Sequence, residues 1–231
     1  MKRILITGSN RGIGLEFTRQ YLESGWRVYA TCRRPAEALS LHALANLHSG
    51  LSIHRLDITL QEDISNIYQE LKDIALDILI NNAGVYFKNR SQGVDCIHYS
   101  EWRRTLEVNT LGTMRVTEAL LENIERSEHR RLVVVISSHM GSIADIDKPG
   151  SIYYRSSKAA LNAAMQGLTV ALRPKRTGVL LLHPGGVSTR IGPEKGISKR
   201  ESVDGMRQII DDFSMEMSGS FLQYDGQKMA W

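Results

Sequence analysis

Short runs of apolar, often β-branched residues alternate along the chain with longer stretches in which apolar residues recur at helical spacing. The first pattern is typical of strands buried on both faces, and the second of amphipathic helices. The predicted strands span residues 3–7, 27–31, 51–56, 77–81, 132–137, 178–183 and 221–224. The predicted helices span residues 12–24, 35–47, 61–74, 101–127, 151–173 and 202–217.

This alternation of strand and helix predicts βαβ units and therefore a parallel sheet. We expect an α/β fold with one doubly wound Rossmann domain over residues 1–231. Its seven-stranded parallel sheet should carry helices on both faces. A length of 231 residues suits one such domain, and no repeat, low-complexity tract or linker divides the chain.

Composition narrows the class of protein further. The longest apolar runs, residues 132–136 and 179–182, are far shorter than the roughly 20 residues needed to cross a bilayer. The apolar run that follows the basic start is too short for a secretory signal. The two cysteines, Cys32 and Cys96, match neither a disulfide framework nor a metal site. We therefore expect a cytoplasmic protein without a membrane span or a bound metal.

The formal net charge of +4 raises the question of nucleic-acid binding. Phosphate contacts need clustered basic residues, and single-strand binders add interleaved aromatic residues. The basic groups here are short and scattered, as at Arg33-Arg34 and Lys199-Arg200. We expect no nucleic-acid partner.

A glycine-rich turn joins the first predicted strand to the first helix. Gly8, Gly12 and Gly14 follow the pattern Gly-x-x-x-Gly-x-Gly, in the strand-turn-helix context that a dinucleotide site requires. Such glycines let the backbone approach a pyrophosphate, which then meets the positive end of the helix dipole. A purely structural turn is the alternative.

The end of the second strand indicates which dinucleotide binds. An acidic residue there would bind the ribose hydroxyl of NAD, but the chain reads Cys32-Arg33-Arg34. Arg11 in the glycine turn brings a further positive charge, and arginine suits bidentate phosphate contacts. The pattern favours NADP over NAD; the alternative is that these arginines are solvated surface residues.

Tyr154 and Lys158 form the candidate reactive pair. Residues four apart share one face of a helix, so Lys158 lies beside Tyr154 and not beside Tyr153. A free phenol has a pKa near about 10, and acid or base action near neutral pH requires stabilisation of the phenolate. A close ammonium lowers the phenol pKa. Taken alone, the pair also fits a solvated helix face.

The chain resembles the short-chain dehydrogenase/reductase family over nearly its whole length. The motifs that carry the resemblance are Thr7-Gly8-x-x-x-Gly12-Ile13-Gly14, Asp57, Asn81-Asn82-Ala83-Gly84, Asn109, Ser137-Ser138, Tyr154-x-x-x-Lys158 and Pro184-Gly185-x-x-x-Thr189, in the order of the family. Arg33 and the ending Tyr224-Asp-Gly226 with Trp231 look most like the carbonyl-reductase-like and C-factor-like branches.

The resemblance implies a hydride transfer between NADP(H) and a carbonyl or alcohol substrate. Tyr154 would be the general acid or base, and Lys158 would bind the nicotinamide ribose and lower the pKa of Tyr154. Ser138 would orient the carbonyl oxygen, and Asn109 would hold a water that links Lys158 to solvent. The alternatives are structural roles: Ser138 would simply end a strand, and Asn109 would make a local hydrogen bond.

The resemblance also implies the surroundings of the cofactor. Asp57 and Ile58 would flank the adenine, residues 82–84 would line the adenosine ribose, and Val187 and Thr189 would hold the carboxamide. The full set of expected cofactor-binding residues is Gly8, Ser9, Asn10, Arg11, Gly12, Ile13, Gly14, Arg33, Asp57, Ile58, Asn82, Ala83, Gly84, Tyr154, Lys158, Pro184, Gly185, Val187 and Thr189.

The substrate, by contrast, has no readable motif. The loop around residues 145–150 is longer than usual for the family and should border the substrate, and Gly186 should open the pocket. His139 and His183 adjoin motif residues but have no visible triad partner, so we assign them no catalysis. A homodimer or homotetramer is expected through helices 101–127 and 151–173. A cofactor-binding signalling protein of the C-factor-like type is the alternative function.

Overall fold

The strands form one sheet that positions the candidate residues. The computed structural model describes residues 1–87, 97–189, 192 and 195–231. All strands pair in parallel, in the order β3-β2-β1-β4-β5-β6-β7. The bounds are β1 Arg3–Ile6, β2 Arg27–Cys32, β3 Leu51–Arg55, β4 Ile78–Asn81, β5 Leu132–Ile136, β6 Gly178–His183 and β7 Phe221–Gln223. The predicted seven-stranded parallel sheet is confirmed.

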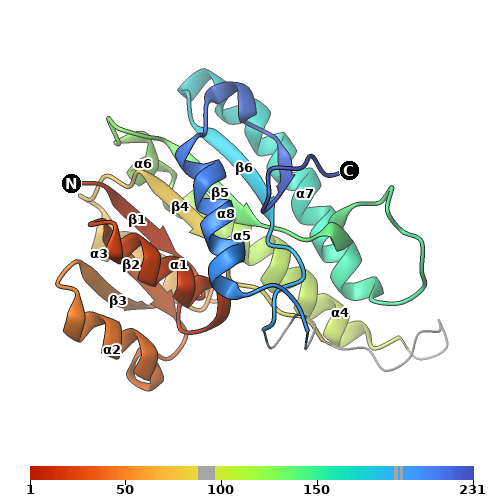
Figure 1. Cartoon of the computed structure of the whole chain (residues 1–231), viewed down its shortest axis with the longest axis horizontal. Coiled ribbons are helices and arrows are strands. Elements are labelled where there is room, and N and C mark those ends of the chain that lie inside the picture. Colours follow the sequence, from red (N-terminus) through yellow and green to blue (C-terminus); the bar gives the residue numbers. More distant parts are fainter. Residues whose placement is uncertain (88–96, 190–191, 193–194) are drawn as a thin grey trace.

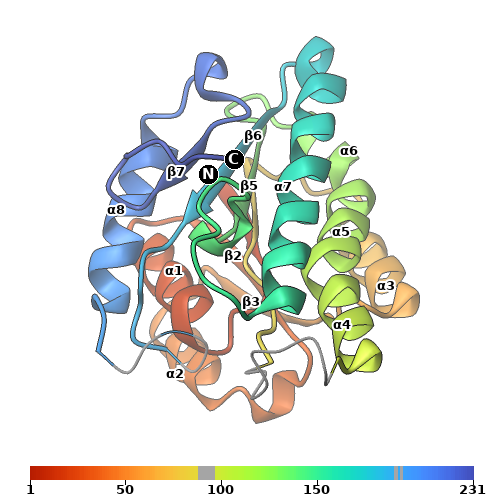
Figure 2. The same cartoon turned by 90° about the vertical axis from the view of Figure 1, so that its right-hand side faces the viewer.

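Helices cover both faces of this sheet, as Figures 1 and 2 show. One layer contains α1 Gly12–Glu23, α2 Leu39–Leu47 and α8 Lys199–Asp211. The other contains α3 Gln61–Leu71, α4 Tyr99–Leu106, α5 Thr113–Ala119, α6 Leu121–Glu125 and α7 Ile152–Leu172. The fold class expected from the alternating pattern is therefore the one observed.

Two hydrophobic clusters, one on each side of the sheet, account for the continuous apolar runs of the central strands. Ile4 and Ile6 of β1 pack into the cluster under α1 and α8, whereas Leu5 between them packs under α5 and α7. Successive side chains of a strand point to opposite faces, so a strand covered on both faces is apolar at every position. All three residues are fully buried.

The sheet reverses its order of connection at β1, which lies between β2 and β4. The crevice beyond the carboxyl ends of strands at such a switch point is where open α/β sheets bind ligands. The turn after β1, the segment after β4 and the segment after β5 all begin at this edge. The candidate residues around Gly8, Asn82 and Ser138 therefore lie on converging segments at this edge.

The predicted helix 101–127 is wrong as a single helix. A π-helical segment, Glu107–Gly112, follows α4, and a further break at Leu120 separates α5 from α6. The π-helix inserts extra backbone into the turn and changes which side chains face inward. Asn109 thereby forms a hydrogen bond with Val85. Gly112 packs against the loop that follows β3, and a Cβ at this position would lie 2.7 Å from the Ile58 carbonyl oxygen.

Other predicted helix bounds also differ. The predicted helix 202–217 begins earlier, at Lys199, and ends at Asp211, and residues Met215–Met217 form a separate 3-10 turn, η6. Pro35–Glu37 is likewise a 3-10 turn, η1, ahead of α2. Proline has no N–H for the helix ladder, so it belongs at the start of a turn rather than inside α2.

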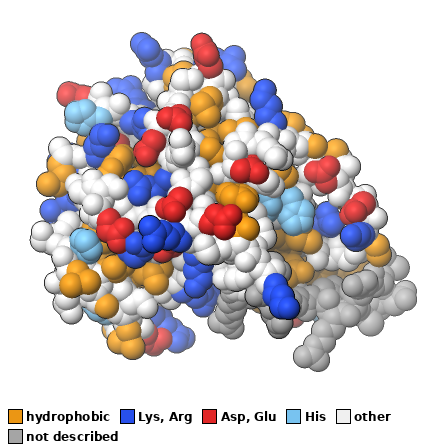
Figure 3. Space-filling view, viewed as in Figure 1, with side chains coloured by type: hydrophobic (Ala, Val, Ile, Leu, Met, Phe, Trp, Pro, Cys, Tyr) orange, Lys and Arg blue, Asp and Glu red, His pale blue; other side chains and the backbone are white. Residues whose placement is uncertain are grey.

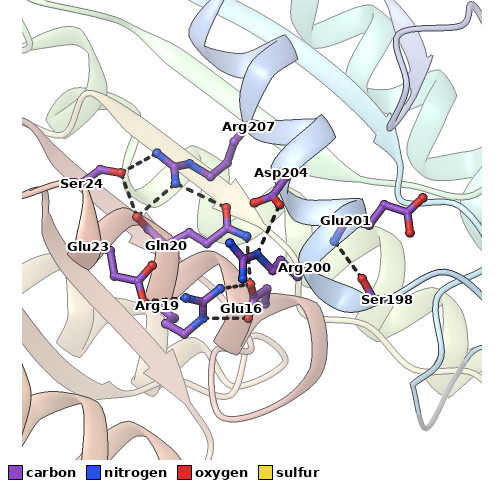
Figure 4. Close-up of polar contacts among 10 residues, drawn as sticks. All are labelled: Glu16, Arg19, Gln20, Glu23, Ser24, Ser198, Arg200, Glu201, Asp204 and Arg207. Atoms are coloured by element: carbon purple, nitrogen blue, oxygen red, sulfur yellow. Dashed lines mark hydrogen bonds and ion pairs between the residues drawn. The ribbon is translucent and has the colours of Figure 1, made fainter.

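A polar network fastens α1 to α8, as Figure 4 shows. The Arg207 guanidinium donates to the Gln20 carbonyl oxygen at 3.1 Å and to Ser24 Oγ at 2.9 Å. It also lies 4.6 Å from the centre of the Tyr21 ring. The helix that follows the glycine turn is thus fixed to the helix that brings Lys199 to the candidate site. On the face shown in Figure 3, basic and acidic side chains lie interspersed.

Candidate active site

A cavity of about 720 Å³ opens at the carboxyl edge of the sheet. Most of the residues predicted from the sequence line it: Gly8, Asn10, Arg11, Gly12, Ile13, Arg33, Asp57, Ile58, Asn82, Ala83, Gly84, Ser138, Tyr154, Lys158, Pro184, Gly185, Val187 and Thr189. We call the part around Gly8, Arg33 and Asp57 the glycine end. The part around Ser138, Tyr154 and His183 is the tyrosine end.

Backbone geometry builds the glycine end. Gly8 and Gly12 have φ values of 67° and 60°, in the left-handed region that favours glycine. Asn82 Nδ2 donates to the carbonyl oxygens of Thr7 at 2.9 Å and Gly8 at 3.1 Å. Thr7 Oγ1 in turn accepts from the backbone N–H groups of Asn82 and Ala83. The turn after β1 and the segment after β4 therefore hold each other in place.

Two of the predicted cofactor residues lie behind the cavity wall rather than in it. A Cβ on Gly14 would lie 2.4 Å from the Gly8 carbonyl oxygen, so glycine permits the close approach of α1 to the turn. Ser9 is fully buried and its hydroxyl donates to the Ile6 carbonyl oxygen at 2.7 Å. Both residues support the shape of the turn.

Three arginines, Arg11, Arg33 and Arg104, line the glycine end together with Asp57. Burial raises the pKa of the Asp57 carboxyl, but hydrogen bonds from Thr59 and the charges of Arg104 and Arg33 hold it below its ordinary value. The carboxylate is therefore ionised near neutral pH, and the surrounding charge is predominantly positive. Arg104 was not predicted from the sequence, and α4 brings it to the site from a distant part of the chain.

The tyrosine end brings Tyr154, Lys158 and Ser138 together. Tyr154 and Lys158 lie on α7, and Lys158 Nζ is 5.8 Å from the centre of the Tyr154 ring. Lys158 Nζ donates to the Ile136 carbonyl oxygen of β5 at 2.8 Å. The Ser138 hydroxyl forms a hydrogen bond with the Tyr154 phenol. Tyr153 is buried and accepts from the His98 N–H at 2.6 Å, outside the cavity.

Burial controls the ionisation of this pair. It raises the pKa of Tyr154 to about 12, although the hydrogen bond with Ser138 opposes the rise. It lowers the pKa of Lys158 to about 8, so the ammonium is still mostly charged near pH 7. The pKa of Tyr154 is therefore raised and not lowered as expected, because desolvation of the phenolate dominates among the residues of the chain.

Asn109 lies behind the wall of the cavity and is fully buried. Its side-chain oxygen accepts from the Val85 N–H at 2.8 Å, and Nδ2 donates to the Val85 carbonyl oxygen at 2.9 Å and to Ser157 Oγ at 3.0 Å. Asn109 therefore ties the segment after β4 to α7, one residue from Lys158. Its expected role in holding a water stays a prediction.

Two histidines complete the tyrosine end. The rings of His139 and His183 lie 4.9 Å apart, and both line the cavity. Burial lowers the pKa of His183 to about 4, and the neighbouring His139 lowers it further, so the buried ring is neutral at pH 7. Burial and the charge of Arg155 also lower the pKa of His139. Neither ring contacts a carboxylate in a triad among the described residues.

The long loop before Tyr154 contributes few residues to the described cavity wall. Among the described residues, its share of the cavity wall is His139 and Met140, and residues 145–150 lie outside the wall. The expectation that residues 145–150 border the substrate stays a prediction. Gly186 does line the cavity, as predicted. Cys96, which the sequence analysis names, lies outside the described residues.

Several lining residues carry no sequence signal. Tyr86 and Val85 follow the Asn81-Asn82-Ala83-Gly84 motif, and Lys199 begins α8. For Tyr86, the available sequence signal was its position two residues after the Asn81-Asn82-Ala83-Gly84 motif. Across the described part of the chain, no three His, Cys, Asp or Glu side chains are grouped to hold a metal ion. No helix of that part combines the length and apolar character of a membrane span.

A Rossmann sheet with this glycine turn and a tyrosine-lysine pair on α7 is the arrangement of an oxidoreductase of the Rossmann class. Residues 2–199 match the family model for short chain dehydrogenases, and the chain belongs to that family.

Comparisons with known proteins place the chain near the carbonyl reductases and C-signal. It is 40% identical over 161 residues to C-signal of Myxococcus xanthus, covering 68% of this chain and 93% of that protein. The NADPH-bound carbonyl reductase from chicken fatty liver superposes with a TM-score of 0.92 at 31% identity, over 100% and 99% of the two chains. Carbonyl reductase Sniffer of D. melanogaster gives 0.90 at 32%, over 100% of both.

Proposed function

We propose that this protein is an NADP(H)-dependent oxidoreductase that interconverts a carbonyl compound and the corresponding secondary alcohol. The observation that carries the proposal is the meeting of Ser138, Tyr154 and Lys158 in one cavity with the glycine turn. A cavity built only to bind a dinucleotide has no need of a buried phenol beside an ammonium. Acid-base chemistry does need both groups.

The geometry supports one role for each of these side chains. The Tyr154 phenol is protonated at neutral pH and would donate its proton to the substrate oxygen. Ser138, already bonded to that phenol, would orient the same oxygen and stabilise charge that develops on it. Lys158, fixed by the Ile136 carbonyl oxygen, would hold the ribose and favour the phenolate that remains after proton transfer. The bound nicotinamide would supply or accept the hydride.

The cofactor is proposed to be NADP(H) rather than NAD(H). Arg11 and Arg33 line the glycine end, and the carboxylate that would bind an NAD ribose is absent from Cys32-Arg33-Arg34. The chicken carbonyl reductase, 31% identical, has NADPH bound. The turn would hold a pyrophosphate, because Gly8 and, at the start of α1, Gly12 and Ile13 line the cavity.

The test is a panel of carbonyl compounds with NADPH and NADH in parallel, followed by cofactor absorbance. The panel contains an aryl ketone, an aliphatic ketone, an o-quinone and a 3-oxo ester. Tyr154→Phe should lower kcat for the best compound by about 10²- to 10⁴-fold, the usual range for a general acid. Tyr153→Phe is the matched control. An unchanged kcat for Tyr154→Phe would refute the mechanism, and a clear NADH preference would refute the choice of cofactor.

A second candidate is a signalling role, favoured by the 40% identity to C-signal. In that case the fold would act through cofactor occupancy or a partner. A genetic test uses a strain in which deletion of the gene for this chain causes a measurable defect. If the Tyr154→Phe protein corrects that defect fully, binding rather than catalysis is the relevant property.

We also propose self-association through the helices beside the site. Leu111 of the π-helix and Val170 of α7 are exposed by 47% and 65%. Apolar side chains of this kind on neighbouring helices suit a symmetric contact. Light scattering at several concentrations should give a dimer or tetramer mass, and a monomer at all concentrations would contradict it.

A further inference from the structure

Tyr86 contacts the start of α7 in two ways. Its hydroxyl lies 2.9 Å from Ser151 Oγ, within hydrogen-bond distance. Its ring meets the Tyr154 ring edge to face, with centres 4.9 Å apart and planes at 69°. Tyr86 also lines the cavity. One side chain from the segment after β4 thus contacts both the first residue before α7 and the proposed acid.

Ser151 has an unusual backbone. It has φ 52° and ψ 28°, the left-handed region that is unfavourable for a residue with a Cβ. Serine before a helix commonly accepts a hydrogen bond from an N–H of the first turn, but Ser151 makes no such bond. Its hydroxyl is paired with Tyr86 instead. A strained backbone persists where surrounding contacts over-determine it, and this pairing is such a contact.

The strain lies close to the reacting groups. The Ser151 carbonyl oxygen accepts from the Arg155 N–H at 2.8 Å in the first turn of α7, and that turn carries Tyr154. The preceding residues of the Tyr86 segment are themselves fixed, because Val85 exchanges hydrogen bonds with Asn109. Tyr86 therefore transmits the position of a rigid segment to the phenol of Tyr154.

We propose that Tyr86 is a positioning residue for the reaction, holding the Tyr154 ring through the Ser151 hydroxyl and through its own ring edge. The inference rests on the proposed function, because it assigns a role toward the Tyr154 acid. Sub-ångström placement of an acid matters more for kcat than for folding, since misplacement by about 1 Å can cost about 100-fold in rate.

The test uses variants that keep the ring or relieve the backbone. Tyr86→Phe removes the hydroxyl and keeps the edge-to-face ring. Ser151→Gly removes the other hydroxyl and suits a positive φ. Tyr68→Phe is the matched control. Tyr68 lies on α3, outside the cavity, and its hydroxyl donates a hydrogen bond to the Glu122 carboxylate at 3.2 Å. Each variant is assayed with NADPH and the panel carbonyl that the parent reduces fastest, and NADPH binding is followed by fluorescence.

Tyr86→Phe and Ser151→Gly should each lower kcat by about tenfold, and the double variant should lower it by no more than either alone. NADPH affinity should stay within about twofold of the parent, and Ser151→Gly should melt no lower than the parent. Tyr68→Phe should leave kcat unchanged.

Two results would overturn the proposal. One is a parental kcat in Tyr86→Phe or Ser151→Gly; the other is multiplication of the two losses in the double variant, which would show independent action. Tyr154→Phe, assayed beside them, keeps the two hypotheses apart. If it is nearly inactive while Tyr86→Phe matches the parent, the positioning role alone fails. If it matches the parent, the proposed function fails.

Discussion

The two ends of the cavity are built differently. At the glycine end, backbone groups and the Asn82 and Thr7 side chains fix the wall through direct hydrogen bonds. At the tyrosine end, side chains from the segments after β4 and β5, from β6 and from α7 meet, and apart from the spacing of Tyr154 and Lys158 they share no local pattern. A site made from backbone conformation requires particular residues at particular spacings, because few residues adopt it. A site made from distant side chains can be assembled in many ways.

The largest effect is expected where the glycine end has no spare space. Gly14→Val places a Cβ 2.4 Å from the Gly8 carbonyl oxygen and 2.5 Å from Asn82 Nδ2. We expect about 3 kcal/mol or more of overpacking, and at least about 100-fold weaker NADPH binding by fluorescence titration. Gly167→Ala, with open space around it in α7, is the control and should be neutral or stabilising. Parental affinity in Gly14→Val would contradict a tight glycine end.

The next effect concerns pH at the tyrosine end. The pKa of buried His183 is about 4 in the folded chain and near about 6.5 unfolded, so the unfolded state binds more protons between these values. Stability should therefore fall by about 2 to 3 kcal/mol as pH falls from 6.5 to 4. Urea unfolding at several pH values measures it. His183→Asn should flatten this slope, whereas exposed His129→Gln should not; equal slopes in all three proteins would refute the assignment.

A smaller effect is expected for the cofactor preference of the glycine end. Arg33→Asp replaces a charge that would attract the 2′-phosphate of NADPH with one that would repel it. NADPH affinity should fall by about 10- to 30-fold, while NADH affinity stays level or rises. Arg34→Asp, whose side chain is exposed and outside the described cavity wall, is the control. An equal loss for both cofactors would mean that Arg33 does not discriminate between them.

The smallest effect tests how α1, which follows the glycine turn, is joined to α8. Arg207→Leu removes hydrogen bonds to Gln20 and Ser24 and the contact with Tyr21, and should cost about 1 to 2 kcal/mol in urea unfolding. Arg200→Leu breaks an exposed 3.7 Å ion pair with Asp204 and should cost less than about 0.5 kcal/mol. The reverse order would show that the network in Figure 4 is not what joins the helices.

The fold was largely predictable from the sequence, for a physical reason. The central strands β4, β5 and β6 are buried along their whole length, so their apolar runs are nearly continuous and their bounds are sharp; β6 has the predicted bounds, Gly178–His183. Helix ends are set by local capping and by tertiary contacts, which hydrophobic spacing does not encode. The break at Glu107–Gly112 therefore went unpredicted, because a π-turn keeps the same apolar residues and changes only their direction.

The same distinction between local sequence patterns and tertiary contacts applies to the residues of the site. The structure places Gly8, Gly12, Tyr154 and Lys158 in one cavity, where local spacing had indicated them, although their roles in the reaction stay predictions. Arg104 and Tyr86 could not be found in this way. Arg104 reaches the glycine end only because α4 packs beside the sheet, and Tyr86 matters only through its contacts with Ser151 and Tyr154.

The π-helix also affects how relatives of this chain should be aligned. One additional residue in a turn shifts the phase of the helix by about 100°, so α4 and α5 present different faces although they run nearly end to end. Deleting Leu111 would remove this phase shift, so Asn109 and α5 could not both keep their present orientations. A gap placed in this segment of an alignment therefore changes which side chains point toward the site. The number of residues between Trp102 and Thr113 is itself a constraint on the site.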